Sequence, residues 1–292
     1  MGCATYWILE MHKISDPILT VENMSVEFPT LSGVVTAVRN VSFTVGREKV
    51  GIIGESGSGK STTGRAVMRL QPPQAIVKAN RMQFEDVDLL TATEDQMLSV
   101  RGRRIAMILQ DPKYSLNPVM TVGEQISETV ILHEKVSRKE ARARTISMLE
   151  RVKIRDPQRV FDLYPHEVSG GMGQRIMISM MLIASPSLII ADEPTSALDV
   201  TVRQQVLSIL DELVVERNIG LIFVSHDLNL VRSFCDRVII MYAGRIVETI
   251  AAADLDNAQH PYTRGLLNAL PSLDHPRDRL EVLRRDPKWL EN

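Results

Sequence analysis

The stretch KVGIIGESGSGKS, residues 49–61, decides the fold of this chain. An apolar run that ends in glycine predicts a short buried strand at 49–54, and residues 59–70 have the apolar spacing of a helix. Residues 54–61 fit the pattern G-x-x-x-x-G-K-[ST], and a preceding strand and a following helix are the context that supports this motif. We therefore predict a loop whose backbone N–H groups surround the phosphates of a nucleotide.

The residues of this loop have different expected tasks. Its glycines let the backbone curl, Lys60 is expected to reach the β- and γ-phosphates, and Ser61 to place its hydroxyl on Mg²⁺. A glycine-rich turn that binds nothing is the alternative, and the flanking strand and helix argue against it. The predicted nucleotide-binding residues are Gly54, Glu55, Ser56, Gly57, Ser58, Gly59, Lys60, Ser61 and Thr62.

A second motif, LIIADEPT at residues 188–195, ends an apolar run with two carboxylates. Asp192 is expected at the end of a strand, where it can hold the Mg²⁺ shell. Glu193 follows directly, and a carboxylate there can polarise the water that attacks the γ-phosphate. A solvated acidic pair in a loop is the alternative for this stretch alone.

A third stretch, VSGGMGQRIMI at residues 168–178, predicts another anion site. Ser169 stands where a helix N-cap would, and Gly170 and Gly171 precede an apolar helical run at Ile176–Ala184. Free backbone N–H groups, a hydroxyl and the positive end of a helix dipole all favour an anion. An ordinary capped helix start is the alternative.

Around these motifs, strands and helices alternate, which predicts an α/β fold. Alternating polar and apolar residues predict an N-terminal antiparallel sheet from 18–28 and 35–45. Further strands are expected at 103–110, 187–192 and 220–226, helices within 121–152 and at 202–217, and a hairpin at 237–250 with its turn at Ala243-Gly244. The helix-rich middle, about 111–185, is interpreted as an inserted subdomain.

Composition narrows the classes of function. Apolar residues make up 44% of the chain, charged residues 24%, and the net charge is −2, so nothing favours a nucleic-acid surface. Aromatic residues are 4%, too few for a base-stacking platform. The two cysteines, Cys3 and Cys235, define no metal spacing, and Cys235 is expected in the core. No apolar run is long enough to span a membrane, and the N-terminus lacks a signal-peptide pattern.

Five segments in this order resemble the ATP-binding subunit of ABC transporters: GESGSGKST, QDP, VSGGM, ADEPTSALD and SHD. The resemblance covers about residues 17–272. It implies an α/β fold made of a RecA-like P-loop NTPase core, an N-terminal antiparallel β subdomain and an inserted α-helical subdomain, with ATP and Mg²⁺ bound. The expected organisation is an extension at 1–16, the ATPase domain at 17–260, and a C-terminal segment at 261–292.

The resemblance also explains why one domain has two anion sites. In this family two subunits pack head to tail, and each ATP lies between the phosphate loop of one and the signature of the other. Ser169, Gly170 and Gly171 would therefore contact the partner's ATP, and Asp199 would lie along the dimer interface.

Further roles are implied residue by residue. Gln110 would reach toward Mg²⁺ and the attacking water, and His226 would contact the γ-phosphate and hold the water for Glu193, although a lone histidine after a strand is more often a polar loop residue. Phe28 falls where the family stacks an aromatic ring on adenine, but strand alternation would equally make it a core residue.

Two longer segments, QDPKYSLNPVMTVGEQI and HPYTRGLLNALPS, resemble the oligopeptide, dipeptide and nickel importers. The implied partners are a second ABC ATPase subunit, two transmembrane permease subunits and, indirectly, an external solute-binding protein, with no nucleic acid. The implied location is the cytoplasmic face of the plasma membrane, with residues around 111–125, Lys113 among them, docked on a permease helix.

The alternative function is a soluble ABC-type ATPase that acts on ribosomes or DNA. Such proteins usually have two cassettes or long insertions, which this chain lacks. A non-hydrolysing nucleotide sensor would need a damaged Glu193 or His226. The sequence departs from the family at Val168, where leucine is usual, and at Gly173, where these importers usually have arginine. The tail has no cysteine, so no iron–sulfur cluster is expected there.

Overall fold

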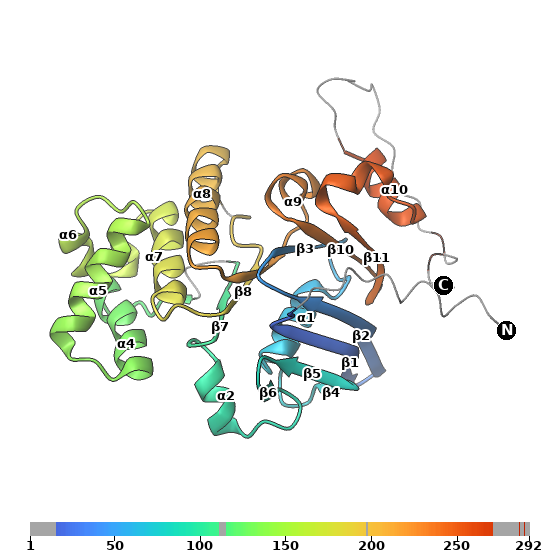
Figure 1. Cartoon of the computed structure of the whole chain (residues 1–292), viewed down its shortest axis with the longest axis horizontal. Coiled ribbons are helices and arrows are strands. Elements are labelled where there is room, and N and C mark those ends of the chain that lie inside the picture. The colour runs from blue at the N-terminus through green and yellow to red at the C-terminus, as the bar shows by residue number, and fades with distance from the viewer. Residues whose placement is uncertain (1–15, 111–114, 197, 271–285, 287–288, 290–292) are drawn as a thin grey trace. The chain divides into compact units, whose positions relative to one another are not determined.

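The structure, a computed structural model, describes residues 16–110, 115–196, 198–270, 286 and 289. The expected extension at 1–16 therefore lies almost entirely outside the described residues, as do Lys113 and most of the tail. The chain divides into two compact units, one formed by residues 1–90 with 225–292 and the other by residues 91–224 (Figure 1).

The first unit contains eight strands and three helices among the described residues. They are β1 (Leu19–Thr30), β2 (Gly33–Val45), β3 (Lys49–Ile53), α1 (Lys60–Val67), β4 (Ile76–Lys78), β5 (Arg81–Phe84), β6 (Val87–Asp88), α9 (Leu228–Phe234), β10 (Arg237–Tyr242), β11 (Arg245–Ala251) and α10 (Pro261–Asn268), with a 3₁₀ turn at Ala252–Asn257.

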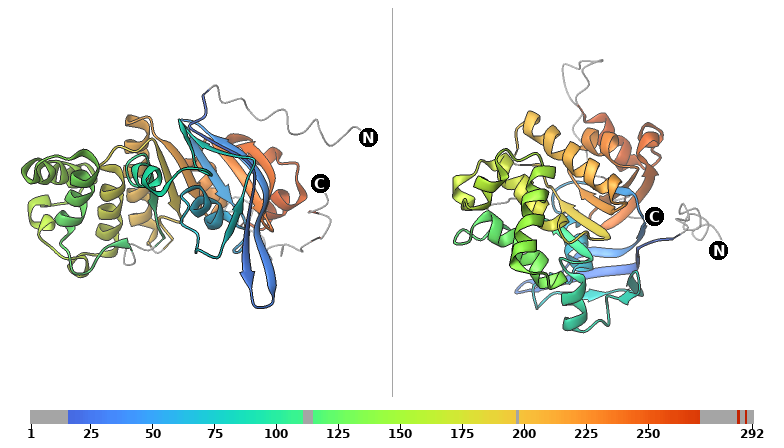
Figure 2. Two further views of the ribbon diagram at one scale, coloured as in Figure 1. Left: turned by 90° about the horizontal axis from the view of Figure 1, so that it is seen from below. Right: turned by 60° about the vertical axis from the view of Figure 1, so that its left-hand side comes forward.

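Long strands β1 and β2 form an antiparallel hairpin in one sheet, ordered β2-β1-β5-β6, with β4 also paired to β1 (Figure 2). Alternation places Leu19 and Val21 in the core. The alternation slips at Asn23, where φ is 53° and the register shifts, so Met24 and Val26 return to the buried face. The expected N-terminal antiparallel sheet is confirmed.

Strand β3 is almost wholly apolar and buried, and it pairs in parallel with β10, which pairs antiparallel with β11. A Cβ at Gly51 would lie 2.3 Å from Val231 Cγ1, so the glycine lets α9 approach the strand closely. Cys235 is buried, as expected, and burial raises the pKa of its thiol to about 12. The predicted turn at Ala243-Gly244 is also confirmed, with φ values of 46° and 83°.

The second unit alternates three parallel strands with helices. Its elements are α2 (Glu94–Val100), β7 (Ile105–Ile108), α4 (Val122–Glu134), α5 (Arg138–Arg151), α6 (Pro157–Phe161), α7 (Gly170–Leu182), β8 (Leu188–Asp192), α8 (Val200–Glu216) and β9 (Gly220–Val224), with a 3₁₀ turn at Pro165–Glu167.

The strands of this unit pair in parallel in the order β7-β8-β9, and every residue of the three is buried. Continuous apolar runs are typical of parallel strands covered on both faces. Because the carboxyl ends of parallel strands share one edge, the residues that follow β7 and β8 are brought to the same edge of the sheet. This arrangement positions the candidate site residues of this unit.

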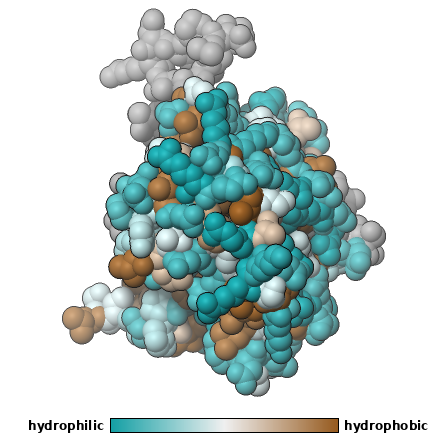
Figure 3. All heavy atoms as spheres, turned by 90° about the vertical axis from the view of Figure 1, so that its left-hand side faces the viewer, coloured by the Kyte–Doolittle hydropathy of each residue, from teal (hydrophilic) through white to brown (hydrophobic). Residues whose placement is uncertain are grey.

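Helices α4 to α7 fill the middle of the sequence. Helix α4 begins with a capping box, in which Thr121 Oγ accepts from Glu124 N at 3.2 Å and the Glu124 carboxylate accepts from Thr121 N at 2.9 Å. A buried hydrogen bond of 3.0 Å joins Ser127 on α4 to Thr145 on α5. The face over α4–α6 is mostly hydrophilic, with scattered apolar side chains (Figure 3). Among the described residues, no helix has the length and apolar character needed to cross a membrane.

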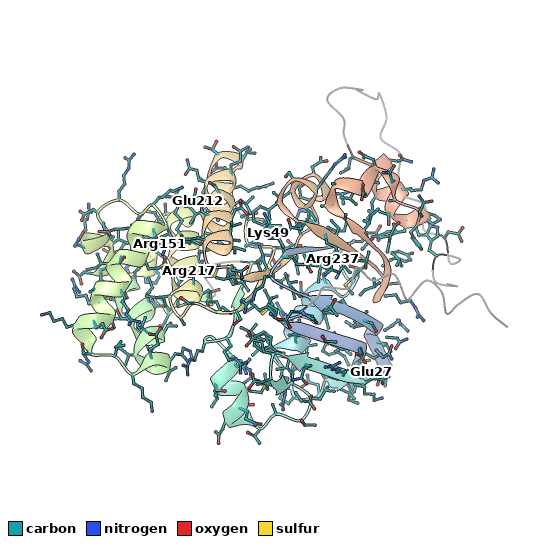
Figure 4. All side chains as sticks on the ribbon, viewed as in Figure 1. Glu27, Lys49, Arg151, Glu212, Arg217 and Arg237 are labelled. Carbon is teal, nitrogen blue, oxygen red and sulfur yellow. The ribbon has the colours of Figure 1, made fainter. Side chains whose placement is uncertain are left out.

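The end of α8 is tied to the end of α7 by Arg217, which is labelled in Figure 4. Its guanidinium donates to the Leu182 carbonyl at 2.6 Å and to Ser185 Oγ at 3.2 Å. The Leu182 carbonyl at the C-terminus of α7 also accepts from Ser185 N at 3.0 Å, so Arg217 adds a second donor there. Desolvation and the nearby Arg151 lower the pKa of Arg217. Arg151 itself pairs with Glu216 on α8.

Candidate functional site

The phosphate loop, defined as residues Gly54–Ser61, has a backbone that favours glycine at three positions, Gly54, Gly57 and Gly59, and is closely packed at the first and the last. Gly54 and Gly59 have φ values of 153° and 100°. A Cβ at Gly54 would lie 2.1 Å from the Met241 carbonyl oxygen, and one at Gly59 would lie 2.6 Å from the Ala37 carbonyl oxygen. The loop is therefore packed against two strands that are distant in sequence, and its curl follows from missing side chains.

Lys60 lies at the centre of this curl and is only 6% exposed. Its ammonium donates to the carbonyl oxygens of Gly54 at 2.8 Å and Glu55 at 2.9 Å. The loop thus holds a buried positive charge on two main-chain carbonyls. Such a charge is suited to an anion, because phosphate oxygens are stronger acceptors than neutral carbonyls.

Two further features of the loop suit a phosphate. Ser58 Oγ is buried and has no hydrogen-bond partner, so a polar group is ready to bond a ligand or water. Gly59 is the N-cap of α1 and supplies no side-chain cap, which leaves the first turn of that helix open to an anion. Ser61 and Thr62 in that turn are half-buried.

The hairpin of β1 and β2 reaches this loop through Ala37, whose carbonyl lies beside Gly59. Phe28 lies on the same hairpin, where it pairs with Val35. The pair Val26–Val38 lies two pairs further along the two strands. Val26 is buried, but Phe28 is only half-buried, so this ring is not a full core residue. Stacking of the ring on adenine stays a prediction.

The run SHD follows β9 and lies in the first unit. Ser225 N donates to the Ile52 carbonyl of β3 at 3.1 Å, and Asp227 caps α9 by accepting from Leu230 N at 3.1 Å. His226 between them is exposed. The flanking residues fix the backbone on both sides of the histidine.

The carboxylates of the second unit lie where β8 ends. Asp192 is 4% exposed, and Glu193 is half-buried with a φ of 49°, a conformation that non-glycine residues seldom adopt. The Gln110 side chain, which follows β7, donates to the Glu193 carboxylate at 3.4 Å. The predicted pair of Gln110 and Glu193 is therefore brought together. Such strain at a titratable residue is typical of functional sites.

The signature turn, defined as residues Val168–Met172, begins α7. Ser169 is the N-cap, and its hydroxyl accepts from Met172 N at 3.4 Å, a long hydrogen bond. Ser169 and Gly170 are exposed, and a Cβ at Gly170 would meet nothing within 4 Å. A Cβ at Gly171 would lie 2.6 Å from Val202 Cγ1 at the start of α8. One glycine thus faces open space while the next permits helix packing.

Asp199 has a local structural role that sequence reasoning did not find. It is the N-cap of α8 and accepts from Val202 N at 3.0 Å. Its side chain is exposed, so the position predicted for it along a dimer interface stays a prediction.

Comparison with known proteins identifies the family. A model described as ABC transporter matches residues 38–196, which is more than half of the chain. The chain belongs to the ABC transporter family. A second model, described as the C-terminal region of oligopeptide/dipeptide transporters, matches residues 247–292.

Relatives and solved structures agree with this assignment. The ABC transporter chain is 45% identical over 260 residues to the oligopeptide transport ATP-binding protein OppD of Bacillus subtilis (strain 168), covering 88% of this chain and 73% of that protein. It is 45% identical to the dipeptide transport ATP-binding protein DppD of the same organism, over 89% and 78% of the two chains. It is also similar to the ATP-binding cassette MJ0796, solved as a dimer in a post-hydrolysis state bound to ADP and Pi, with a TM-score of 0.72, 26% identity and coverage of 80% and 98%.

The match confirms the ABC cassette fold, with its antiparallel β subdomain and parallel strands. The predicted site residues of the ABC transporter chain fall in both units. The first holds Phe28, the phosphate loop and His226, and the second holds Gln110, the signature turn, Asp192, Glu193 and Asp199. The boundaries 17–260 and 111–185 and the individual roles stay predictions.

Sequence reasoning missed one residue that contacts the phosphate loop. The Tyr262 hydroxyl accepts from Glu55 N at 3.0 Å, across 207 residues of sequence. The segment HPYTRGLLNALPS carries the likeness to peptide importers, but no local pattern in it indicates this contact.

Proposed function

We propose that this chain is the ATP-hydrolysing subunit of an ABC importer for peptides or similar small solutes. Relatives that are 45% identical are named as oligopeptide and dipeptide transport ATP-binding proteins, and the C-terminal segment matches their family. The observation that carries the proposal is the glycine-walled loop that buries the ammonium of Lys60 on two carbonyls. A Cβ at Gly54 or Gly59 would collide with the strands behind the loop, so these glycines allow the curl that suits a phosphate chain.

The chemistry is hydrolysis of the terminal phosphoryl group. Water attacks the γ-phosphorus, the bond from that phosphorus to the β–γ bridging oxygen breaks, and ADP and phosphate leave. Lys60 exchanges its carbonyl acceptors for phosphate oxygens and neutralises the charge that grows on them. Glu193 orients the water and accepts its proton, with Gln110 and His226 helping to hold that water.

The donor set also suits Mg²⁺. Ser61, Asp192 and Gln110 offer the hydroxyl, carboxylate and amide oxygens that this ion prefers, and the bound ion would neutralise charge on the β- and γ-phosphates. Phe28, which is half-buried, would stack on the adenine ring.

The remaining partners follow from the signature turn. Its exposed Ser169 and Gly170 would meet the ATP held by the phosphate loop of a second ATPase subunit packed head to tail, with Asp199 along the interface. Two permease subunits would contact residues around 111–125 at the cytoplasmic face of the membrane. An external binding protein would deliver the solute to the permeases.

Replacement of Glu193 by glutamine tests the hydrolytic role in the chain assembled with its partner ATPase. We expect phosphate release to fall by at least about 100-fold while ATP affinity is kept, because the water loses its proton acceptor. Glu216→Gln, which changes a surface carboxylate paired with Arg151, is the matched control. Turnover near wild type in Glu193→Gln would contradict the assignment.

The transport role is tested by purification of the tagged full chain from membranes of its native host. We expect it to come with two membrane-spanning subunits in equal amounts. Recovery with ribosomes or DNA and without membrane proteins would overturn the importer proposal and favour a soluble ABC-type ATPase.

A further inference from the structure

The C-terminal helix α10 places one aromatic side chain directly behind the phosphate loop. Tyr262 is the second residue of this helix and has a relative exposure of 0%. Its hydroxyl accepts a hydrogen bond of 3.0 Å from the backbone N–H of Glu55. The segment matched by the C-terminal model of oligopeptide/dipeptide transporters thus contacts the loop predicted to bind nucleotide.

The contact acts on one defined peptide group. The N–H of Glu55 and the carbonyl of Gly54 belong to the same peptide, and that carbonyl accepts from Lys60 Nζ at 2.8 Å. In a planar trans peptide the N–H and the C=O point in opposite directions. The hydroxyl of Tyr262 therefore holds the N–H on one side, and this fixes the carbonyl toward Lys60 on the other side.

The glycine makes this restraint necessary. Gly54 has a φ of 153°, in a region of backbone space where glycine is free and other residues are not. The peptide that follows such a residue has little intrinsic preference for one orientation. A hydrogen bond to its N–H is the kind of contact that selects one of them.

Tyr262 is itself held firmly. Its ring packs on Tyr242 at a centroid distance of 4.6 Å and on Trp289 at 5.7 Å. Its backbone N–H donates to Nδ1 of His260 at 3.2 Å, and the backbone N–H of His260 donates to the carboxylate of Glu248. The hydroxyl is therefore a fixed acceptor.

We propose that Tyr262 is a positioning residue for nucleotide binding, which latches the Gly54–Glu55 peptide so that its carbonyl keeps facing Lys60 and the loop stays open for phosphates. This inference rests on the proposed function, because it concerns the same loop. When phosphates take over Lys60, the latched peptide keeps the loop in shape, so binding requires no rearrangement of the main chain. A loop without the latch would have to select this peptide orientation at each binding event.

Tyr262→Phe in the full chain tests the latch, since it removes one oxygen and keeps the ring. We expect the dissociation constants of Mg-ATP and Mg-ADP to rise about 5- to 10-fold, the value of one lost hydrogen bond. We expect KM for ATP to rise by the same factor with kcat changed less than about 2-fold, because the latch acts on binding geometry. Hydrogen exchange of the Glu55 amide, followed by NMR, should become faster.

Trp289→Leu is the matched control, because it removes a ring that packs on Tyr262 and leaves the hydroxyl. It should lower the melting temperature at least as much as Tyr262→Phe and change nucleotide affinity less. Equal loss of affinity in both variants, with exchange of the Glu55 amide unchanged in Trp289→Leu, would mean that stability is the cause and would overturn the latch. Unchanged affinity and unchanged Glu55 exchange in Tyr262→Phe would also overturn it. Failure of the wild-type chain to bind ATP would instead refute the proposed function.

Discussion

The phosphate loop and the signature turn share a design, since both place glycines and a serine at the start of a helix. Their surroundings differ. In the phosphate loop, a Cβ at Gly54 would meet a carbonyl oxygen at 2.1 Å, and Lys60 is 6% exposed. In the signature turn, a Cβ at Gly170 would meet nothing within 4 Å, and Ser169 is exposed.

The difference separates two reasons for glycine at an anion site. At Gly54 the backbone conformation and the contact with the Met241 carbonyl require it, so the loop is complete within its own unit. At Gly170 neither requirement exists, so the absent side chain keeps a surface clear for something that comes from outside. The first site should therefore fail in the isolated chain when altered, and the second only in the assembly.

The largest effect is expected at Lys60. Lys60→Ala should weaken Mg-ATP binding by the isolated chain about 100-fold or more, because it removes the charge that bonds the phosphates. Isothermal titration calorimetry measures this affinity. Lys78→Ala, which removes an exposed lysine paired with Glu27 in the same unit, should leave it unchanged. Unaltered binding by Lys60→Ala would end the assignment of the loop.

The second effect compares one glycine from each region. Gly54→Ala should lower the free energy of unfolding by about 3 kcal/mol, since the new methyl group meets backbone at a strained φ. Gly170→Ala should change it by less than about 1 kcal/mol, in the stabilising direction. Urea denaturation of the two full-length variants measures both values. Equal losses would remove the distinction drawn between the two regions.

The third effect should be absent from the isolated chain and large in the assembly. Ser169→Arg places a bulky side chain at an exposed position, so ATP affinity of the isolated chain should stay within about 2-fold of wild type, as expected for a surface substitution. In the complex, hydrolysis at the partner's phosphate loop should fall at least about 100-fold. Mixing the variant with a wild-type partner separates the two sites. Loss of the mutant chain's own ATP binding would show that the signature acts within one subunit.

The smallest effect is expected at His260, whose Nδ1 accepts from the backbone N–H of Tyr262. Burial lowers the pKa of His260, although Glu248 opposes the shift, so the neutral ring is favoured in the folded protein. A lowered folded pKa gives stability that is present above the unfolded value of about 6.5 and is lost as pH falls through the folded value. Protonation would add a proton to Nδ1, which accepts from Tyr262 N.

The melting temperature of the wild type should therefore fall between pH 7 and pH 5 by more than that of His260→Asn. Asparagine can cap the same N–H but does not titrate. An identical pH dependence in the two proteins would mean that His260 does not contribute. The signature turn holds no such group, so this pH dependence is expected only on the phosphate-loop side of the comparison.

Much of the fold could be predicted because its elements have strong periodicity. The long strands β1 and β2 alternate, and β7, β8 and β9 are continuous apolar runs, so sequence alone located them. The short strands β4, β5 and β6 and the short helices α2 and α9 were missed. Elements of two to seven residues contain too few periods to stand out, and their pairing partners decide their conformation.

The candidate site likewise contains residues that a local motif predicts and a contact that it does not. Residues of the phosphate loop could be located because their task is local: the motif contains its own glycines and lysine. The contact of Tyr262 with Glu55 spans 207 residues and depends on how α10 packs, which no local pattern encodes. The capping role of Asp199 is local as well, because an aspartate directly before a helical run is a typical N-cap.

Helices α7 and α8 contact each other at three places. Gly171 packs against Val202 near their starts, Arg175 donates a hydrogen bond to Gln205 at 2.6 Å, and Arg217 donates one to the Leu182 carbonyl at their ends. Close packing near the starts and hydrogen bonds at Arg175 and Arg217 oppose sliding of α7 along α8. A displacement of Ser169 would therefore move α7 and α8 together. Gln205→Ala would remove the hydrogen bond from Arg175. The signature turn would then move without a matching displacement of Asp199.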